Sequence, residues 1–112
     1  MAKVIITKKL EEDVNKIFKK QSIKILESMK ELENSPYKGK PVGQVSGIVI
    51  KELKYDNYRF YFITDGFKLK TLQKEELDDL LMKFVRMSDK KDQQKVIEEI
   101  KNILRNIGEA GF

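Results

Sequence analysis

The N-terminal third of the chain combines a short β-branched run with a long amphipathic stretch. Residues 3–7 have the composition of a strand, and Thr7 can cap a following helix by accepting a hydrogen bond from a free N–H of its first turn. Apolar residues then recur at intervals near 3.6 through residues 8–33, which predicts a helix. Gln21 and Ser22 interrupt this stripe, so we expect either a bend or a break into a hairpin of two helices.

Turn-forming pairs divide the middle of the chain. Glycine and proline are frequent in residues 37–47, which are therefore expected to form a loop. Beyond it, the pairs Asp56-Asn57 and Asp65-Gly66 are typical of tight hairpin turns between strands. The pattern predicts a twisted antiparallel meander within residues 45–72, with strands at residues 48–55, 58–64 and 67–72.

The last third carries two helical stripes. Apolar side chains at i, i+3, i+4, i+7 and i+8 predict a helix over residues 74–87. Either Ser88 or Asp89 can cap a second helix, which is expected to stop at Gly108. The stripe of the first of these helices consists of Leu77, Leu80, Leu81, Phe84 and Val85.

Together these elements predict one α+β domain over residues 1–112. Its twisted antiparallel sheet, residues 45–72, packs against an N-terminal helical hairpin within residues 1–36, and additional C-terminal helices occupy residues 74–107. A length of 112 residues and an apolar content of 40% suit a single domain with a modest core.

The composition removes several classes of chemistry. The chain has no cysteine and no histidine, which excludes disulfides, a thiolate nucleophile, the usual general base and the usual zinc ligands, so we expect no metal and no cofactor. The first apolar run is too short for a signal peptide, and no stretch approaches the roughly 20 apolar residues that span a bilayer. A cytoplasmic location is the default expectation.

Positive charge is concentrated in the middle of the sequence. The net charge is +5, and residues 37–74 hold 8 basic and 3 acidic side chains, which is again +5, so the flanking segments cancel. In a strand, alternate side chains face opposite ways, which places Lys54 and Arg59 on one face beside aromatic rings. Basic side chains can bind phosphates, and aromatic rings can stack on bases. The combination is therefore suited to binding a polyanion such as RNA. Alternatively, lysines on solvent-facing strands only discourage edge-to-edge aggregation.

A family resemblance is carried by the segment SPYKGKPVGQVSGIVIKELKYDNYRFYFITDG. Its Gly-Lys-Pro loop, a strand ending in Glu52-Leu53-Lys54, a turn and the run that starts at Tyr58-Arg59 resemble the RelE/ParE superfamily of toxin–antitoxin toxins. The later run Lys83-Phe84-Val85-Arg86 before a terminal helix is similar to the HigB branch. The resemblance implies a ribosome-dependent messenger RNA endonuclease that is blocked by a cognate antitoxin protein.

The resemblance also implies roles for particular residues. Arg59 matches the family's second-strand arginine and is expected to stabilise the phosphate, while Lys54 matches the basic residue of the Glu-Leu-Arg motif. Lys74 stands where an arginine would follow the sheet. Residues expected to contact RNA are Lys38, Lys40, Lys51, Tyr58, Lys83 and Arg86.

Attack of a ribose 2′-hydroxyl on the adjacent phosphate also requires groups that move two protons. Lys51 or Lys54 can act as the base if crowding by like charges lowers its pKa, and Tyr61 or Tyr58 is the candidate acid. No histidine or tyrosine follows Tyr61. Two lysines that precede the hairpin in a well-known relative correspond here to Ile50 and Glu52.

Other interpretations stay open. Arg59 can simply pair with Glu52 across the hairpin, for about 0.2–1 kcal/mol. Lys83 and Arg86, at the end of the predicted helix, can interact with its dipole. A second hypothesis is a superfamily member that binds DNA gyrase, or one that binds nucleic acid or protein without catalysis. A third is that the C-terminal helices, whose segment is net acidic, mask the basic face or form a dimer contact, so the oligomeric state is open between monomer and dimer.

Overall fold

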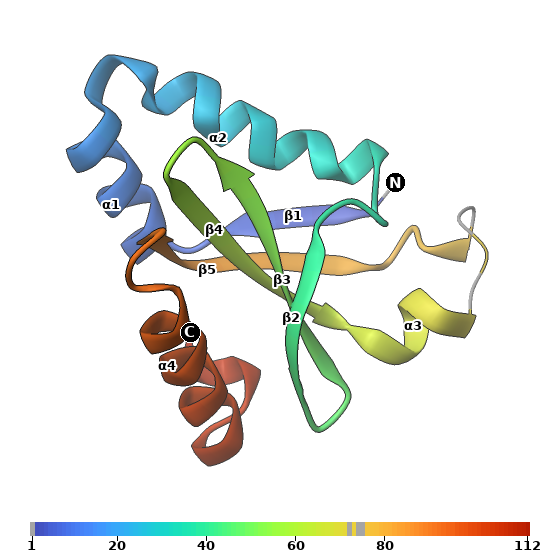
Figure 1. The fold of residues 1–112 in the computed structure, drawn as a ribbon. Coiled ribbons are helices and arrows are strands. Elements are labelled where there is room, and N and C mark those ends of the chain that lie inside the picture. Colours follow the sequence, from blue (N-terminus) through green and yellow to red (C-terminus); the bar gives the residue numbers. More distant parts are fainter. Residues whose placement is uncertain (1, 72, 74–75) are drawn as a thin grey trace.

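The computed structural model describes residues 2–71, 73 and 76–112. Within them the chain is an α+β fold with a mixed five-stranded sheet in the order β1-β5-β4-β3-β2 (Figure 1). Strands β1 and β5 are parallel, and the other neighbours are antiparallel. The strands are β1 (Lys3–Ile6), β2 (Lys40–Val45), β3 (Ile48–Tyr55), β4 (Tyr58–Asp65) and β5 (Leu81–Asp89). The helices are α1 (Lys8–Phe18), α2 (Ser22–Lys30), α3 (Gly66–Thr71) and α4 (Gln93–Asn106), with 3-10 turns at Lys19–Gln21, Glu31–Asn34 and Glu109–Gly111.

The N-terminal strand and the helical hairpin are confirmed. Thr7 caps α1, because its side chain accepts a hydrogen bond from the backbone N–H of Leu10 at 3.4 Å. Lys19 has a φ of 51°, in the left-handed region, so the helix ends there and the chain turns into α2. The break therefore lies beside Gln21 and Ser22, where the apolar stripe is interrupted.

The expectation of a loop over residues 37–47 is wrong in its second half, because Lys40–Val45 forms strand β2. This strand lies at the edge of the sheet and pairs with β3, with a bulge between Pro41 and Gly43. Proline and glycine had indicated a loop. Proline, which cannot donate a ladder hydrogen bond, is tolerated in an edge strand, and both residue types fit a bulge.

The expected third strand of the meander, residues 67–72, is also wrong as far as the structure describes it. Residues Gly66–Thr71 form helix α3. The Asp65 carboxylate accepts hydrogen bonds from the backbone N–H groups of Phe67 and Lys68, at 2.9 and 3.1 Å. The Asp-Gly pair therefore starts a helix and does not form a hairpin turn, since the aspartate side chain satisfies the free donors of the first turn.

The helix expected over residues 74–87 is replaced by strand β5, which follows a connecting segment with buried Leu77 and Leu80. Strand β5 lies between β1 and β4 in the sheet, and its side chains belong to the cores on both faces, so its sequence is apolar without strict alternation. Phe84 and Val85 belong to the cores on opposite faces of the sheet, and Val85 is the extra residue of a bulge in the pairing with β4, which places Val85 and Arg86 on the same face. Apolar residues on both sides of a bulged strand thus produced a spacing that resembles a helix.

The last helix is confirmed, but it begins later than expected. Helix α4 starts at Gln93, because Ser88 and Asp89 still belong to β5. It ends at Asn106, shortly before Gly108, whose φ of 90° suits only glycine well.

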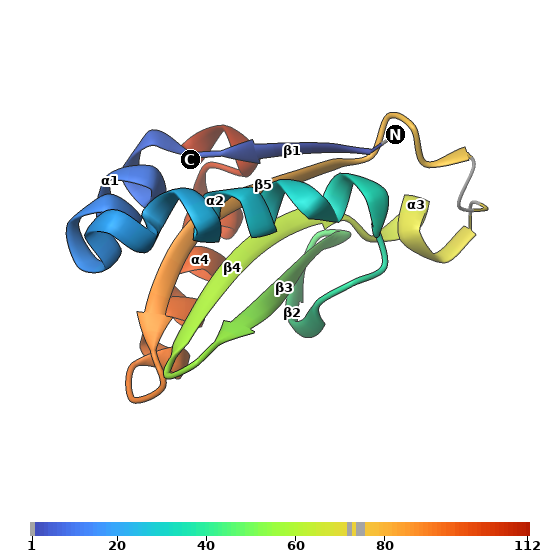
Figure 2. The ribbon, with the colours of Figure 1, turned by 90° about the horizontal axis from the view of Figure 1, so that it is seen from above.

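The two helical layers lie on opposite faces of the sheet. Helices α1 and α2 cover one face, where Leu10, Ile25 and Phe62 belong to the core (Figure 1). Helix α4 covers part of the other face, where Ile100 and Tyr61 belong to a second core. Figure 2 shows α2 lying across the sheet and β5 bending away from β1. Among the described helices none is long and apolar enough to cross a membrane.

Candidate functional site

Two rows of polar side chains cross the sheet on the face that α4 partly covers. The strand registers place their members directly opposite one another on neighbouring strands. We call them the inner and the outer row. The inner row is Lys40, Glu52, Tyr61 and Arg86, and the outer row, nearer the Asp56-Asn57 turn, is Lys54, Arg59 and Ser88.

Arg59 is held rigidly at the centre of these rows. Its Nη1 donates hydrogen bonds to the backbone carbonyls of Asp56, at 3.3 Å, and Tyr58, at 3.0 Å. Its Nε lies 4.0 Å from Oε2 of Glu52. The predicted cross-strand pair of Arg59 and Glu52 is therefore present, and Arg59 keeps further N–H donors that could bind an anion.

Glu52 carries an unsatisfied oxygen. Its side chain is 11% exposed, and Oε2 is buried with no hydrogen-bond partner among the described residues. Because a buried polar atom without a partner costs about 1–3 kcal/mol, a bound group that donates a hydrogen there would be favoured. The sequence had indicated this glutamate as part of the Glu-Leu-Lys motif, as an ion-pair partner of Arg59 and as a departure from a lysine, and the carboxylate was missed as a candidate proton acceptor.

Tyr61 of the inner row is hydrogen-bonded to Ser88 of the outer row, on the neighbouring strand. It is fully buried, and its hydroxyl hydrogen-bonds to Oγ of Ser88 at 2.8 Å. Burial is the main cause that raises the pKa of Tyr61, Glu52 and Asp89 raise it further, and the Ser88 hydrogen bond and Arg59 oppose the shift. This tyrosine therefore stays protonated at neutral pH and joins β4 to β5.

Arg86 is attached to the C-terminal part of the chain. Its Nε donates to the carboxylate of Glu99 on α4, and its Nη1 donates to the carbonyl of Val85 at 2.7 Å. The guanidinium carbon lies 5.2 Å from the ring centroid of Phe112. Arg86 and Lys83 both lie within β5, so the expectation that they interact with a helix dipole is wrong. Reading β5 as a helix also hid Glu99 and Phe112 as neighbours of the site.

The remaining expected residues are distributed over different parts of the molecule. Lys54 is exposed beside Arg59, and Lys40 is exposed on β2 in the inner row. Lys38 is exposed in the segment before β2. Lys74 lies outside the described residues.

Two expected RNA contacts, Lys51 and Tyr58, lie on the opposite face. Tyr58 packs with its ring 5.0 Å from that of Phe18. Lys51 is buried, and its ammonium donates to the carbonyl of Tyr37 at 3.1 Å and lies 5.8 Å from the ring centroid of Phe62. Burial lowers the pKa of Lys51, so desolvation, and not crowding by like charges, perturbs it.

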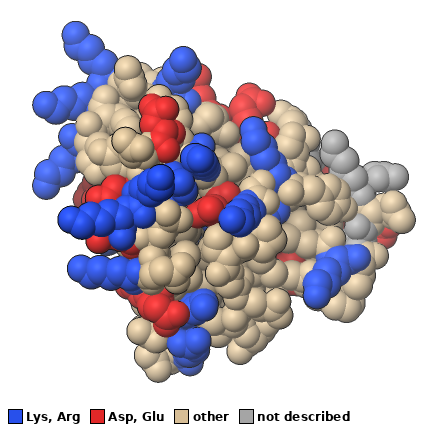
Figure 3. Space-filling model, viewed as in Figure 1, with Lys and Arg blue, Asp and Glu red and all other residues tan. Residues whose placement is uncertain are grey.

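Figure 3 shows basic side chains projecting from one edge of the molecule and others nearer the centre, with acidic side chains between them. On this view positive charge is therefore interspersed with negative charge. Selective binding of an anion would then depend on the local geometry around Arg59 more than on one continuous basic patch.

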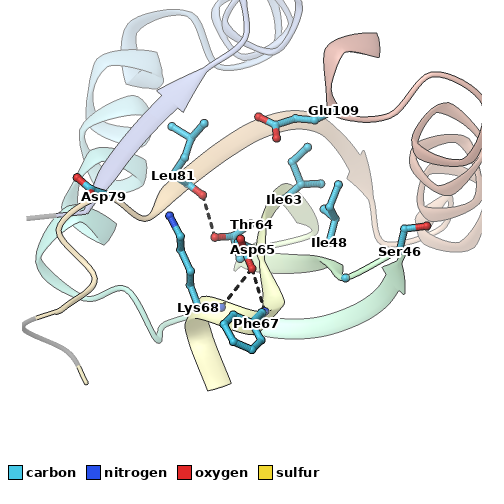
Figure 4. A pocket seen from close by; sticks show the side chains of 11 residues that line it. Ser46, Ile48, Ile63, Thr64, Asp65, Phe67, Lys68, Asp79, Leu81 and Glu109 are labelled. Atoms are coloured by element: carbon cyan, nitrogen blue, oxygen red, sulfur yellow. Dashed lines mark hydrogen bonds between the residues drawn. The ribbon is translucent and has the colours of Figure 1, made fainter. Parts of the chain in front are cut away.

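A cavity of about 430 Å³ lies at the other end of β4 (Figure 4). Two of its polar side chains serve local structure, since Thr64 donates to the carbonyl of Leu81 at 2.8 Å and Asp65 caps α3. The cavity is separated from Arg59 by the length of the strand. It is not part of the candidate site.

No group of three or more potential metal-ligating side chains occurs in the part of the chain that the structure describes. The candidate site is a cation–carboxylate arrangement on strands β3 and β4, with Arg59 and Glu52 at its centre and Lys54 at its exposed side. Comparisons with protein-family models, with curated proteins and with solved structures found no match to this chain.

Proposed function

We propose that this protein is a toxin similar to RelE and HigB, an endoribonuclease that cleaves messenger RNA on the ribosome and is blocked by a cognate antitoxin. The observation that carries the proposal is the Arg59–Glu52 pair, 4.0 Å apart, with exposed Lys54 opposite Arg59 in register. The order of elements, in which a strand and a helical hairpin precede antiparallel strands and a terminal helix, supports a RelE-like arrangement. A cytoplasmic location belongs to the same proposal.

These three side chains supply the parts that the reaction needs. Glu52 accepts the proton of a ribose 2′-hydroxyl, whose oxygen then forms a bond to the adjacent phosphorus. Arg59 stabilises the charge that develops on the non-bridging phosphate oxygens. The bond from phosphorus to the 5′ oxygen breaks, and that oxygen takes a proton from the Lys54 ammonium. The products are a 2′,3′-cyclic phosphate and a 5′-hydroxyl end.

The test is inducible expression with mapping of the 5′ ends of messenger RNA on ribosomes. Wild type should slow growth and produce new 5′-hydroxyl ends, and Glu52→Gln should reduce cleavage by about a hundredfold or more, as expected for loss of a general base. Arg59→Ala and Lys54→Ala should also reduce it. Arg105→Ala, which removes an exposed arginine from α4, is the matched control and should leave cleavage unchanged.

The nuclease proposal fails if wild type yields no new ends, or if Glu52→Gln cleaves as well as wild type while circular dichroism shows both folded. The first result would favour a second candidate function, binding of DNA gyrase or another macromolecule without catalysis. The low exposure of the site favours that candidate, since the Arg59 side chain is only 8% exposed and Arg86 is held by Glu99 and Phe112.

A further inference from the structure

A second recess lies on the sheet face opposite Arg59. It is a groove of about 470 Å³ between edge strand β2 and helix α3, open along the sheet edge. Its walls are mainly apolar, and its described lining includes two lysines and no acidic side chain. Val49, Lys51, Leu69 and Lys70 are among its lining residues.

Lys51 is the unusual member of this lining. The residue is 4% exposed, yet no ion pair joins its ammonium to a carboxylate among the described residues. A lysine ammonium has three N–H donors, and the hydrogen bond to Tyr37 occupies only one of them. A buried charge is normally paired, so a carboxylate placed in the groove would compensate for desolvation already incurred in folding.

We propose that the groove binds an acidic segment of a partner polypeptide, with an Asp or Glu side chain on Lys51 and flanking apolar side chains on Val49 and Leu69. Charge complementarity supports this occupant, because Lys70 adds a second positive charge to a groove whose described lining has no acidic side chain. In the described sheet β2 is an edge strand, and its outer edge favours an extended peptide, which can pair along such an edge. The inference goes beyond the proposed nuclease, since the groove and Arg59 lie on opposite faces.

The test is selection of a random peptide library on the full wild-type chain. The selected peptides should share one Asp or Glu between apolar residues. A synthetic representative should bind wild type at least about tenfold more tightly than it binds Lys51→Met, a loss of about 1.4 kcal/mol. Replacing its acidic residue by the matching amide should weaken binding to wild type similarly.

Two further variants keep the result interpretable. Lys70→Glu reverses an exposed charge of the lining, so it should fold normally and weaken peptide binding. Lys24→Met removes an exposed lysine from α2 and should bind like wild type. Thermal unfolding checks that every variant is folded.

The proposal is overturned if the selected peptides show no acidic preference, or if they bind folded Lys51→Met and wild type equally. Binding of sodium octanoate, followed by chemical shifts of Val49 and Leu69, without any peptide binding would also overturn it. That result would assign the groove to small carboxylates. Loss of peptide binding in Lys51→Met with messenger RNA cleavage unchanged would separate the two proposals.

Discussion

Lys51 on β3 and Arg59 on β4 are both buried cations, and they differ in how their charge is compensated. They are 4% and 6% exposed and lie on neighbouring strands, but they face opposite sides of the sheet. Arg59 has two backbone carbonyls and the Glu52 carboxylate, whereas Lys51 has one carbonyl and an aromatic ring. Similar burial therefore does not imply a similar role, because Arg59 belongs to an ion pair and Lys51 has no counter-ion among the residues that the structure describes.

The largest expected change in stability comes from breaking the ion pair between Arg59 and Glu52. Arg59→Ala leaves the Glu52 carboxylate buried without a cation and should lower the free energy of unfolding by about 3–5 kcal/mol. The double variant Glu52→Gln with Arg59→Ala should be less destabilised than Arg59→Ala alone. Urea unfolding of the three proteins measures both changes, and equal stability of the single and double variants would contradict the pairing.

Removing the charge of Lys51 is expected to raise, and not lower, the free energy of unfolding. Lys51→Met removes a buried charge and keeps a flexible side chain of similar length, so it should raise the free energy of unfolding by about 1–2 kcal/mol at pH 7. The effect should depend on pH. The unfolded chain binds more protons than the folded chain between the lowered pKa of Lys51 and its usual value of 10.5, so wild-type stability should rise with pH through that window.

Urea midpoints of wild type and Lys51→Met over a pH series test this expectation. The advantage of the variant should shrink as the pH approaches 10.5. Lys24→Met, at an exposed position, should show no such trend. A constant difference between Lys51→Met and wild type would mean that the Lys51 ammonium is not desolvated.

Replacing Tyr61 should have a smaller effect on the free energy of unfolding, and it should lower stability where Lys51→Met raises it. Tyr61→Phe removes the hydrogen bond to Ser88 and should cost about 0.5–1.5 kcal/mol at neutral pH. The pKa of Tyr61 is raised, so above pH 10 the unfolded chain loses this proton first and wild-type stability falls with pH. The cost of Tyr61→Phe should therefore decrease above pH 10, measured from urea midpoints.

The smallest expected effect concerns the attachment of Arg86 to α4. Glu99 is half exposed, so Glu99→Gln should change the free energy of unfolding by less than about 1 kcal/mol. It should still strengthen RNA binding, because it frees the Arg86 guanidinium and removes a negative charge near the inner row. Fluorescence anisotropy with a labelled single-stranded RNA measures this change. Glu98→Gln, which changes the charge equally on the same helix, should have a smaller effect.

The parts of the fold that were predicted correctly have local causes. The hairpin of α1 and α2 follows from an amphipathic stripe and a threonine cap, and the pairing of β3 with β4 follows from the Asp56-Asn57 turn. The register of this hairpin also brought Glu52 opposite Tyr61 and Lys54 opposite Arg59, so the centre of the candidate site could be predicted.

The errors arose where distant segments decide the structure. Strand β5 is buried between two other strands and bulged, so its sequence lacks the alternation that identifies a strand. Because β5 was predicted as a helix, Ser88 and Arg86 were not expected to belong to the sheet. The Asp65-Gly66 pair is compatible with a hairpin or a helix start, and only the packing of the following residues distinguishes them. No local pattern reports that α4 and Phe112 lie against the inner row.

The parallel pairing of β1 with β5 has a consequence for synthesis of the chain. Lys3 pairs with Leu81, and in the described sheet β5 also supplies the neighbour of β4. A nascent chain that stops before residue 81 therefore exposes the unpaired edges of both β1 and β4. Such contacts between distant segments fold slowly, and open strand edges favour aggregation. Synthesis of β5 should thus be the event that pairs both edges and converts an aggregation-prone fragment into a continuous sheet.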